Sequence, residues 1–149
     1  MERILLADDG SENALKAVGI ASELAAKTGA ELIALAVIDP YSIDPLDVMA
    51  LAGSAKVDYG QALECQVAEL ATYLDRCQEA ATRAGVGRFR SVRRDGSDTV
   101  LEIIDFARAH DIDLIVVGCR GRSRLPGLLL GSVSQKLAAY APCPVLIAR

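Results

Sequence analysis

The chain has few of the features that mark exported, metal-binding or nucleic-acid-binding proteins. No apolar run approaches the roughly 20 residues that cross a bilayer, and the first residues show no cleavage-site pattern. The four cysteines form no C-x-x-C pair, and their spacing from the single histidine does not suggest zinc. A formal net charge of −4 lacks the basic excess of a nucleic-acid or anionic-membrane binder. We therefore expect a cytoplasmic protein with reduced thiols and neither nucleic acid nor membrane as a partner.

The first half of the chain alternates between strand and helix patterns. With 149 residues and 52% hydrophobic content, we expect one domain over residues 1–149. The apolar run Arg3–Ala7 predicts a strand, and a helical stripe from Ser11 ends at Gly29. The continuous apolar run Glu31–Ile38 predicts a strand covered on both faces. Residues 39–57 show weak periodicity and contain two prolines, which predicts a mobile segment or lid.

The second half continues the alternation. A stripe stepping three or four residues from Tyr59 predicts a long helix that Gly85 closes. The further elements expected are an edge strand at 88–94, a helix after the capping sequence 95–98, a buried strand at 113–117, a helix at 132–140 and a last strand at 145–148. The pattern predicts an α/β fold: a doubly wound, Rossmann-like, mostly parallel sheet in the order 3-2-1-4-5 with helices on both faces.

The segment Gly118–Ser132 concentrates four glycines and three arginines in an acidic protein. Gly118 follows a buried strand, and Gly121 adopts a positive φ at little cost, so the two can form a backbone nest. Gly131 and Ser132 open a helix whose unpaired N–H groups favour an anion, assisted by the hydroxyls of Ser132 and Ser134. Phosphate fits this arrangement, although the glycines of a plain surface loop would make turns too.

The same segment matches neither of two common phosphate-binding motifs. A P-loop needs Gly-Lys-Ser/Thr, whereas Val133 follows Ser132, and no G-x-G-x-x-G follows the first strand. The spacing Gly118-x2-Gly121-x9-Gly131-Ser132 instead resembles the nucleotide-binding signature of the universal stress protein family, in its ATP-binding branch. The likeness continues along the chain through "RILLADDGSENALKAVGIASELAAKTGAELIALAVID" and "GSVSQKLAAYAPCPVLIAR".

The resemblance implies a set of binding residues. Asp9 matches a position near the ribose or a phosphate-bound Mg²⁺, and Val37 matches one whose backbone faces adenine. Further matching positions surround the ribose and phosphates or follow the first strand: Ala7, Val117, Gly118, Gly121, Gly131, Ser132, Val133 and Ser134. Beside them, the guanidinium of Arg120, Arg122 or Arg124 can pair with phosphates, with solvent exposure as the alternative for each. The resemblance implies ATP, or alternatively ADP or AMP, as the ligand, bound together with Mg²⁺.

The function favoured by these residues is an ATP-binding regulatory protein of the stress response. Three alternatives stay open: slow ATP hydrolysis or autophosphorylation using Asp8 and Asp9, a nucleotide-independent interaction module, and redox sensing through Cys119. No conventional catalytic base is evident, because the only histidine, His110, falls at a helix end by the opposite ends of the strands. The apolar last strand at 145–148 predicts a homodimer, as the resemblance also implies, and the protein partner is open.

Overall fold

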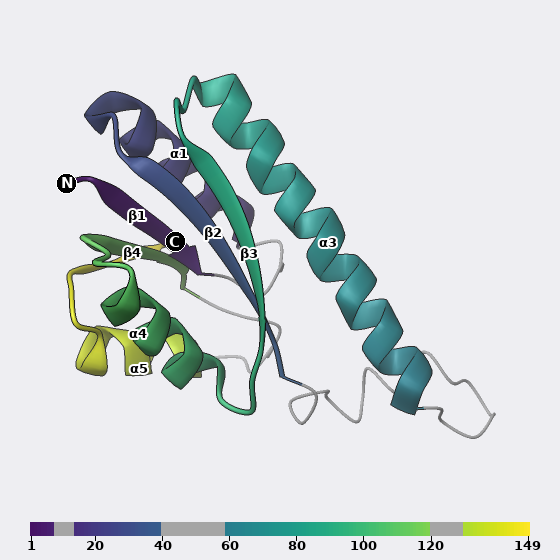
Figure 1. Ribbon diagram of the computed structural model, residues 1–149. Helices are drawn as coiled ribbons and strands as arrows, with labels where there is room; N and C mark the ends of the chain where they lie inside the picture. Colours follow the sequence, from purple (N-terminus) through teal and green to yellow (C-terminus); the bar gives the residue numbers. More distant parts are fainter. Residues whose placement is uncertain (8–13, 40–58, 120–129) are drawn as a thin grey trace.

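The computed structural model describes residues 1–7, 14–39, 59–119 and 130–149. Within them lies a five-stranded sheet in the order β3-β2-β1-β4-β5, and every neighbouring pair is parallel (Figure 1). The predicted α/β class and the predicted strand order are therefore confirmed. The strands are β1 Arg3–Ala7, β2 Glu31–Ile38, β3 Phe89–Asp95, β4 Leu114–Gly118 and β5 Val145–Ala148.

Helices cover both faces of the sheet. The helices are α1 Ala14–Thr28, α3 Tyr59–Ala84, α4 Thr99–Ala109 and α5 Ser132–Tyr140. One buried cluster joins α1 and α3 to a first face of the sheet, through residues such as Leu6 and Leu32. A second cluster joins α4 and α5 to the other face, through residues such as Leu5 and Ile33. Because side chains alternate between two faces that are both covered, β1 and β2 are apolar after their first residues, Arg3 and Glu31.

The chain reverses its direction of travel across the sheet between β1 and β4. From β1 it proceeds outward through β2 to β3, and then returns to place β4 on the other side of β1. In doubly wound sheets this switch creates the crevice where ligands bind, beyond the carboxyl ends of the strands. The topology thus selects the ends of β1 and β4 as the place to look for a site.

Local signals in the sequence set the helix ends. Gly29 and Gly85 adopt φ values of 71° and 77° directly after α1 and near the end of α3, as expected for glycine caps. At the start of α4, Asp98 accepts hydrogen bonds from the backbone N–H groups of Val100 (2.9 Å) and Leu101 (3.2 Å). The carboxylate accepts from amides that have no partner within the helix, and its negative charge interacts favourably with the positive end of the helix dipole.

Some expected stripe members are not in the core. Leu15 of α1 and Leu101 of α4 are 44% and 57% exposed, although each belongs to the apolar pattern that predicts its helix. In α3, Tyr73 is buried at 4% exposure, a position that the expected stripe omits. The start of α1 expected at Ser11 and the segment 40–58 lie outside the described residues. No helix in the described part of the chain is long and apolar enough to cross a membrane.

Candidate functional site at the carboxyl ends of the strands

Four of the predicted ligand contacts lie at the carboxyl edge of the sheet. Ala7 ends β1 and is level with Val117, one residue beyond the aligned pair Leu6 and Val116. Both side chains are buried, at 1% and 4% exposure. Gly118 ends β4, and Val37 lies near the end of β2, two residues past the partner of Ala7. Three neighbouring strands therefore bring these positions together at the switch point.

A set of hydrogen bonds fixes the start of α5 against the end of β4. The carbonyl of Cys119 accepts a bond from the Gly131 N–H at 2.7 Å, and the Cys119 N–H donates to the carbonyl of Ala148 at 2.7 Å. The Ser134 hydroxyl lies 3.2 Å from the Cys119 carbonyl and 2.9 Å from that of Gly131. We call the bonds between Cys119 and Gly131 and between Cys119 and Ser134 the β4–α5 clasp. It holds the amino end of α5 beside the carboxyl end of β4.

The first turn of α5 is suited to an anion. Its N-cap is Gly131, which has no side chain to bond the first amides, and the Gln135 N–H is bonded to the Gly131 carbonyl. The turn contains no acidic residue, and Ser132 is exposed. The amides of Ser132, Val133 and Ser134 have no acceptor within the helix, and the helix dipole adds a partial positive charge there. Helix N-termini of this kind are where phosphate binds in many proteins.

The structure gives Ser134 a role that the sequence did not suggest. Its side chain is buried and its hydroxyl is directed at two carbonyls, so it donates within the clasp. Val133 is half-buried and packs against the α4 and α5 cluster. A contact of either residue with phosphate remains a prediction, and for both the backbone N–H is the group that the geometry favours.

Several predicted site residues lie outside the described part of the chain. They are Asp9, Arg120, Gly121 and Arg122, together with Asp8 and Arg124 from the wider set of candidates. Cys119, the proposed redox residue, is described: its side chain is 9% exposed and its thiol is not in a disulfide. Among the described residues no group of three or more histidine, cysteine or acidic side chains is placed to hold a metal ion.

One polar residue at this edge was missed by the sequence reading. Asp39 directly follows β2, at the start of the segment 39–57 in which no site residue was predicted, yet the residue is 8% exposed. Buried carboxylates are rare, because burial removes their hydration. Its position two residues after Val37, at the carboxyl edge of a parallel sheet, is the signal that could have drawn attention to it.

His110 lies at the other end of the molecule. Its backbone caps α4, and its carbonyl accepts a 2.7 Å bond from the Arg3 guanidinium at the start of β1. The imidazole is half-buried, because it stacks on Phe106 with ring centroids 3.9 Å apart. The histidine therefore lies at the amino edge of the sheet, and the length of the strands separates it from the candidate site at the carboxyl edge.

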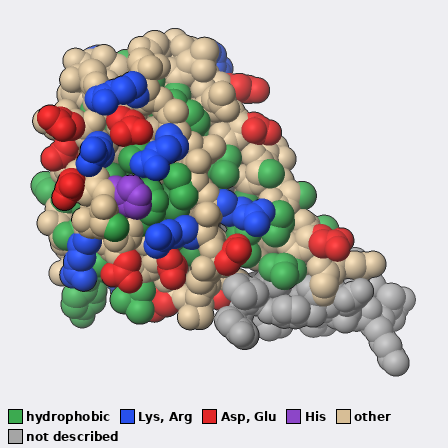
Figure 2. Space-filling view, in the orientation of Figure 1, with side chains coloured by type: hydrophobic (Ala, Val, Ile, Leu, Met, Phe, Trp, Pro, Cys, Tyr) green, Lys and Arg blue, Asp and Glu red, His purple; other side chains and the backbone are tan. Residues whose placement is uncertain are grey.

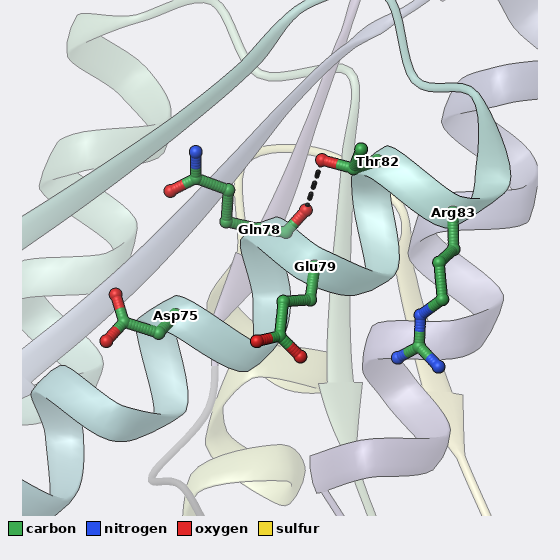
Figure 3. Close-up of a pocket in the computed structure, with 5 residues that line it drawn as sticks. All are labelled: Asp75, Gln78, Glu79, Thr82 and Arg83. Carbon is green, nitrogen blue, oxygen red and sulfur yellow. Dashed lines mark hydrogen bonds between the residues drawn. The ribbon is translucent and has the colours of Figure 1, made fainter.

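A shallow depression on α3 offers no comparable site (Figure 3). Its lining comes from a single helix and consists of exposed side chains: Asp75, Gln78, Glu79, Thr82 and Arg83. The Thr82 hydroxyl donates to the carbonyl of Gln78 at 2.8 Å, an ordinary bond within a helix. This part of α3 leads into the amino end of β3, away from the carboxyl edge.

The fold is that of a doubly wound α/β protein whose carboxyl edge carries a helix start without a side-chain cap, and the comparison with known proteins agrees with this fold. The family model described as "Universal stress protein family" matches residues 1–149. A universal stress protein of Thermus aquaticus is 33% identical over 149 residues, covering 98% of this chain and 97% of the relative. The chain belongs to the universal stress protein family.

Solved structures show the same architecture. Universal stress protein UspA from Lactobacillus plantarum superposes with a TM-score of 0.82 at 24% identity, covering 99% of this chain and 97% of the other. A universal stress protein solved in complex with cAMP gives a TM-score of 0.71 at 26% identity, covering 99% and 96% of the two chains. The stress response protein NhaX of Bacillus subtilis is 32% identical, over 99% of this chain and 98% of the relative.

Proposed function

We propose that this protein binds an adenine nucleotide, ATP or alternatively ADP or AMP, at the carboxyl edge of the sheet. In this proposal, occupancy of the site by the nucleotide regulates a homodimer. The observation that carries the proposal is the β4–α5 clasp, which presents an uncapped helix start beside the ends of β1 and β4. The complex of a similar protein with cAMP supports an adenine nucleotide as the ligand class.

In this proposal, different residues contact the adenine, the ribose and the phosphates. The backbone of Val37 faces adenine, and Val117 and Gly118 lie beside the ribose, with Ala7 at the end of the neighbouring strand. The side chains of Ala7 and Val117 are buried, so the backbone is the contact surface there. The first-turn amides of α5 and the Ser132 hydroxyl bind the phosphates. Gly121, Arg120 and Arg122 complete the phosphate site, and Asp9 lies near a Mg²⁺ ion that the nucleotide brings with it.

A substitution at Ser132 tests the phosphate contact without damaging the helix. Ser132→Asp places a carboxylate at the first position of α5, where the helix dipole stabilises it but a phosphate is repelled. We expect about tenfold or more weaker binding of ATP with Mg²⁺, since 1.4 kcal/mol of repulsion suffices for that factor. Ser132→Asn has the same shape without the charge and is the matched control.

The measurement is calorimetric titration of ATP with Mg²⁺ into the three proteins, after denaturing a sample of each to detect nucleotide that is already bound. Retained binding by Ser132→Asn with loss in Ser132→Asp supports a phosphate at this helix start. Equal affinity in all three proteins would mean that the nucleotide binds elsewhere. If wild type neither binds ATP nor contains resident nucleotide, the proposal is refuted in favour of an interaction module. Steady phosphate release from ATP by wild type, lost in Asp9→Asn, would instead favour the hydrolase.

A further inference from the structure

The strand β3 forms an open edge of the sheet on the side away from β5. Among the described residues it pairs with β2 alone, through seven aligned positions from Leu32 and Phe89 to Ile38 and Asp95. Four of its seven side chains are exposed. An edge of this length presents backbone N–H and C=O groups to which another strand can bond.

The hydrogen bonds to β2 show which backbone groups are available. The Leu32 N–H donates to the carbonyl of Arg88 at 2.9 Å, and the Gly96 N–H donates to that of Ile38 at 3.0 Å. In a parallel ladder the residues of one strand alternate between facing the partner and facing away. Even-numbered residues of β3 therefore bond to β2, and the backbone groups of Ser91 and Arg93 face outward.

The side chains beside this edge are basic with an apolar residue between them. Arg90, Val92 and Arg94 share the face of the sheet that α4 covers, because their β2 partners on that face are Ile33, Leu35 and Val37. The guanidinium of Arg94 lies 5.5 Å from the Phe106 ring centre. Figure 2 shows basic and acidic side chains interspersed around the histidine, with hydrophobic atoms exposed between them.

These arginines have donors to spare. The Nε of Arg90 is 3.6 Å from a Glu31 carboxylate oxygen, and one Nη of Arg94 is 3.2 Å from Glu102. Each guanidinium carries five N–H groups, so a single carboxylate leaves several of them for another acceptor. Arg90 and Arg94 are 44% and 39% exposed, which leaves them accessible.

The charge of the edge selects its occupant. Four of the chain's 16 basic residues lie between Arg88 and Arg94, although the protein is acidic overall. Within the described part of the chain, Arg88 has no ion-pair partner, and the nearest carboxylate to Arg93 is that of Asp95 at 4.0 Å. Such charges repel the same edge of a second copy, which is how natural edges avoid self-pairing, but they attract an acidic strand.

We propose that β3 binds an extended acidic segment of a partner protein, which adds to the sheet as a further strand. The segment has the pattern acidic-x-apolar-x-acidic. Its apolar residue packs beside Val92, and its two carboxylates reach Arg90 and Arg94, because alternate residues of a strand share one face. Its backbone bonds to the outward groups of Ser91 and Arg93. Arg94 is the register partner of Val37, which we place at the nucleotide site, but strand addition to β3 requires no nucleotide, so its test does not depend on the proposed function.

The test uses a fluorescent peptide with the sequence Thr-Glu-Thr-Val-Thr-Glu-Thr, blocked at both ends. The matched control peptide, Glu-Thr-Thr-Val-Thr-Thr-Glu, has the same composition but places valine and the carboxylates on opposite faces. We expect the first peptide to bind with sub-millimolar affinity that weakens as salt screens the charges, and the second to bind at least about tenfold more weakly. No binding of the first peptide, or equal binding of both, would overturn the proposal.

Proline substitution separates strand addition from simple charge attraction. Ser91→Pro removes an outward N–H and leaves the bonds to β2 intact, whereas Ser91→Ala keeps the N–H. We expect Ser91→Pro to weaken binding at least about tenfold and Ser91→Ala to leave it unchanged. If Ser91→Pro fails to fold, amide shifts of the wild type decide: movement of the Ser91 and Arg93 signals on adding peptide supports strand addition, and their constancy refutes it.

Discussion

The two edges of the sheet differ in chemistry although both end a parallel ladder. At β5 the four residues are Val-Leu-Ile-Ala, three of them half-buried, and they carry no charge. At β3 the seven residues include three arginines and are mostly exposed. The Ile115 N–H donates to the carbonyl of Pro144, and the Cys119 N–H donates to that of Ala148. By the alternation of a parallel ladder, the backbone N–H and C=O groups of Val145 and Ile147 therefore face away from β4.

This difference assigns the edges different partners. An apolar edge gains by pairing with a copy of itself, which is the homodimer we propose at β5. Self-pairing of a basic edge is destabilised, because arginines would face arginines, whereas pairing with an acidic strand is stabilised by the opposite charges. One sheet can in this way take part in two associations without competition between them.

The largest effect expected comes from placing proline on the inward side of β3. By the same alternation, the Val92 N–H bonds to the carbonyl of Ala34, which is fully buried. Val92→Pro removes that donor, and an unsatisfied buried carbonyl costs about 1–3 kcal/mol before any strain is added. We expect urea unfolding to show a clearly lower free energy of unfolding for Val92→Pro, and a much smaller decrease for Ser91→Pro. Equal losses in the two variants would contradict the assigned alternation.

Proline at the outward side of β5 tests the apolar edge. Ile147→Pro removes an N–H that faces away from β4, so we expect it to convert the dimer to monomer, while Ile147→Val retains the dimer. Light scattering after size-exclusion chromatography gives the mass of each. The proposed homodimer at β5 fails if wild type is monomeric or if Ile147→Pro leaves the mass unchanged. Ser91→Pro at the other edge serves as a second dimeric control.

A third prediction compares the centre of the sheet with its edges. Hydrogen bonds from the backbone N–H groups of Glu2 and Arg3 lower the pKa of the Asp113 carboxyl. Because the folded pKa lies below the unfolded value of about 3.9, the stabilisation is complete above that value and is lost as pH falls through the folded pKa. We expect Asp113→Asn to lower the Tm at pH 7.

The pH series supplies the check on this interaction. The Tm difference between wild type and Asp113→Asn should shrink as the pH falls well below 4. Asp105→Asn, an exposed carboxylate on α4, is the control and should show little difference at either pH. A Tm difference for Asp113→Asn that persists at the lowest pH would mean that the carboxylate charge is not responsible.

The smallest effect is expected at Glu31, which links the central strand to the basic edge. Its carboxylate lies 3.8 Å from Arg3 Nε and 3.6 Å from Arg90 Nε, and both arginines are well exposed. Glu31→Gln should cost about 0.2–1 kcal/mol, an amount that high salt reduces. Thermal unfolding at two salt concentrations measures it. A cost that salt does not change would indicate lost packing in place of lost charge.

Much of the fold was predictable because its signals are local. The alternation of apolar runs with helical stripes predicts the strand and helix order, and the glycines at 29 and 85 end two helices at the expected places. Which residues of a helix are buried is less local: Leu15 and Leu101 fit the helical period but are 44% and 57% exposed. Sequence spacing alone does not show where the sheet ends beneath a helix.

The candidate site was predictable in place but less so in detail. Motif spacing placed Gly118, Gly131 and Ser132 at one edge, and the topology does the same. The donation from the Ser134 hydroxyl to the Cys119 carbonyl depends on contact between residues 15 positions apart, which no periodicity encodes. The burial of Asp39 likewise depends on its tertiary neighbours.

The β4–α5 clasp has a consequence for how this protein family tolerates change. Its bonds join Cys119 to Gly131 and Ser134, so the chain between Cys119 and Gly131 enters and leaves at two fixed points. Doubling the length of a closed loop costs only about 0.6 kcal/mol in closure entropy. Insertions and exchanges between those points therefore leave the frame nearly undisturbed. If the proposed nucleotide site is correct, we expect substitutions between those points to change ligand preference while the clasp and the fold stay the same.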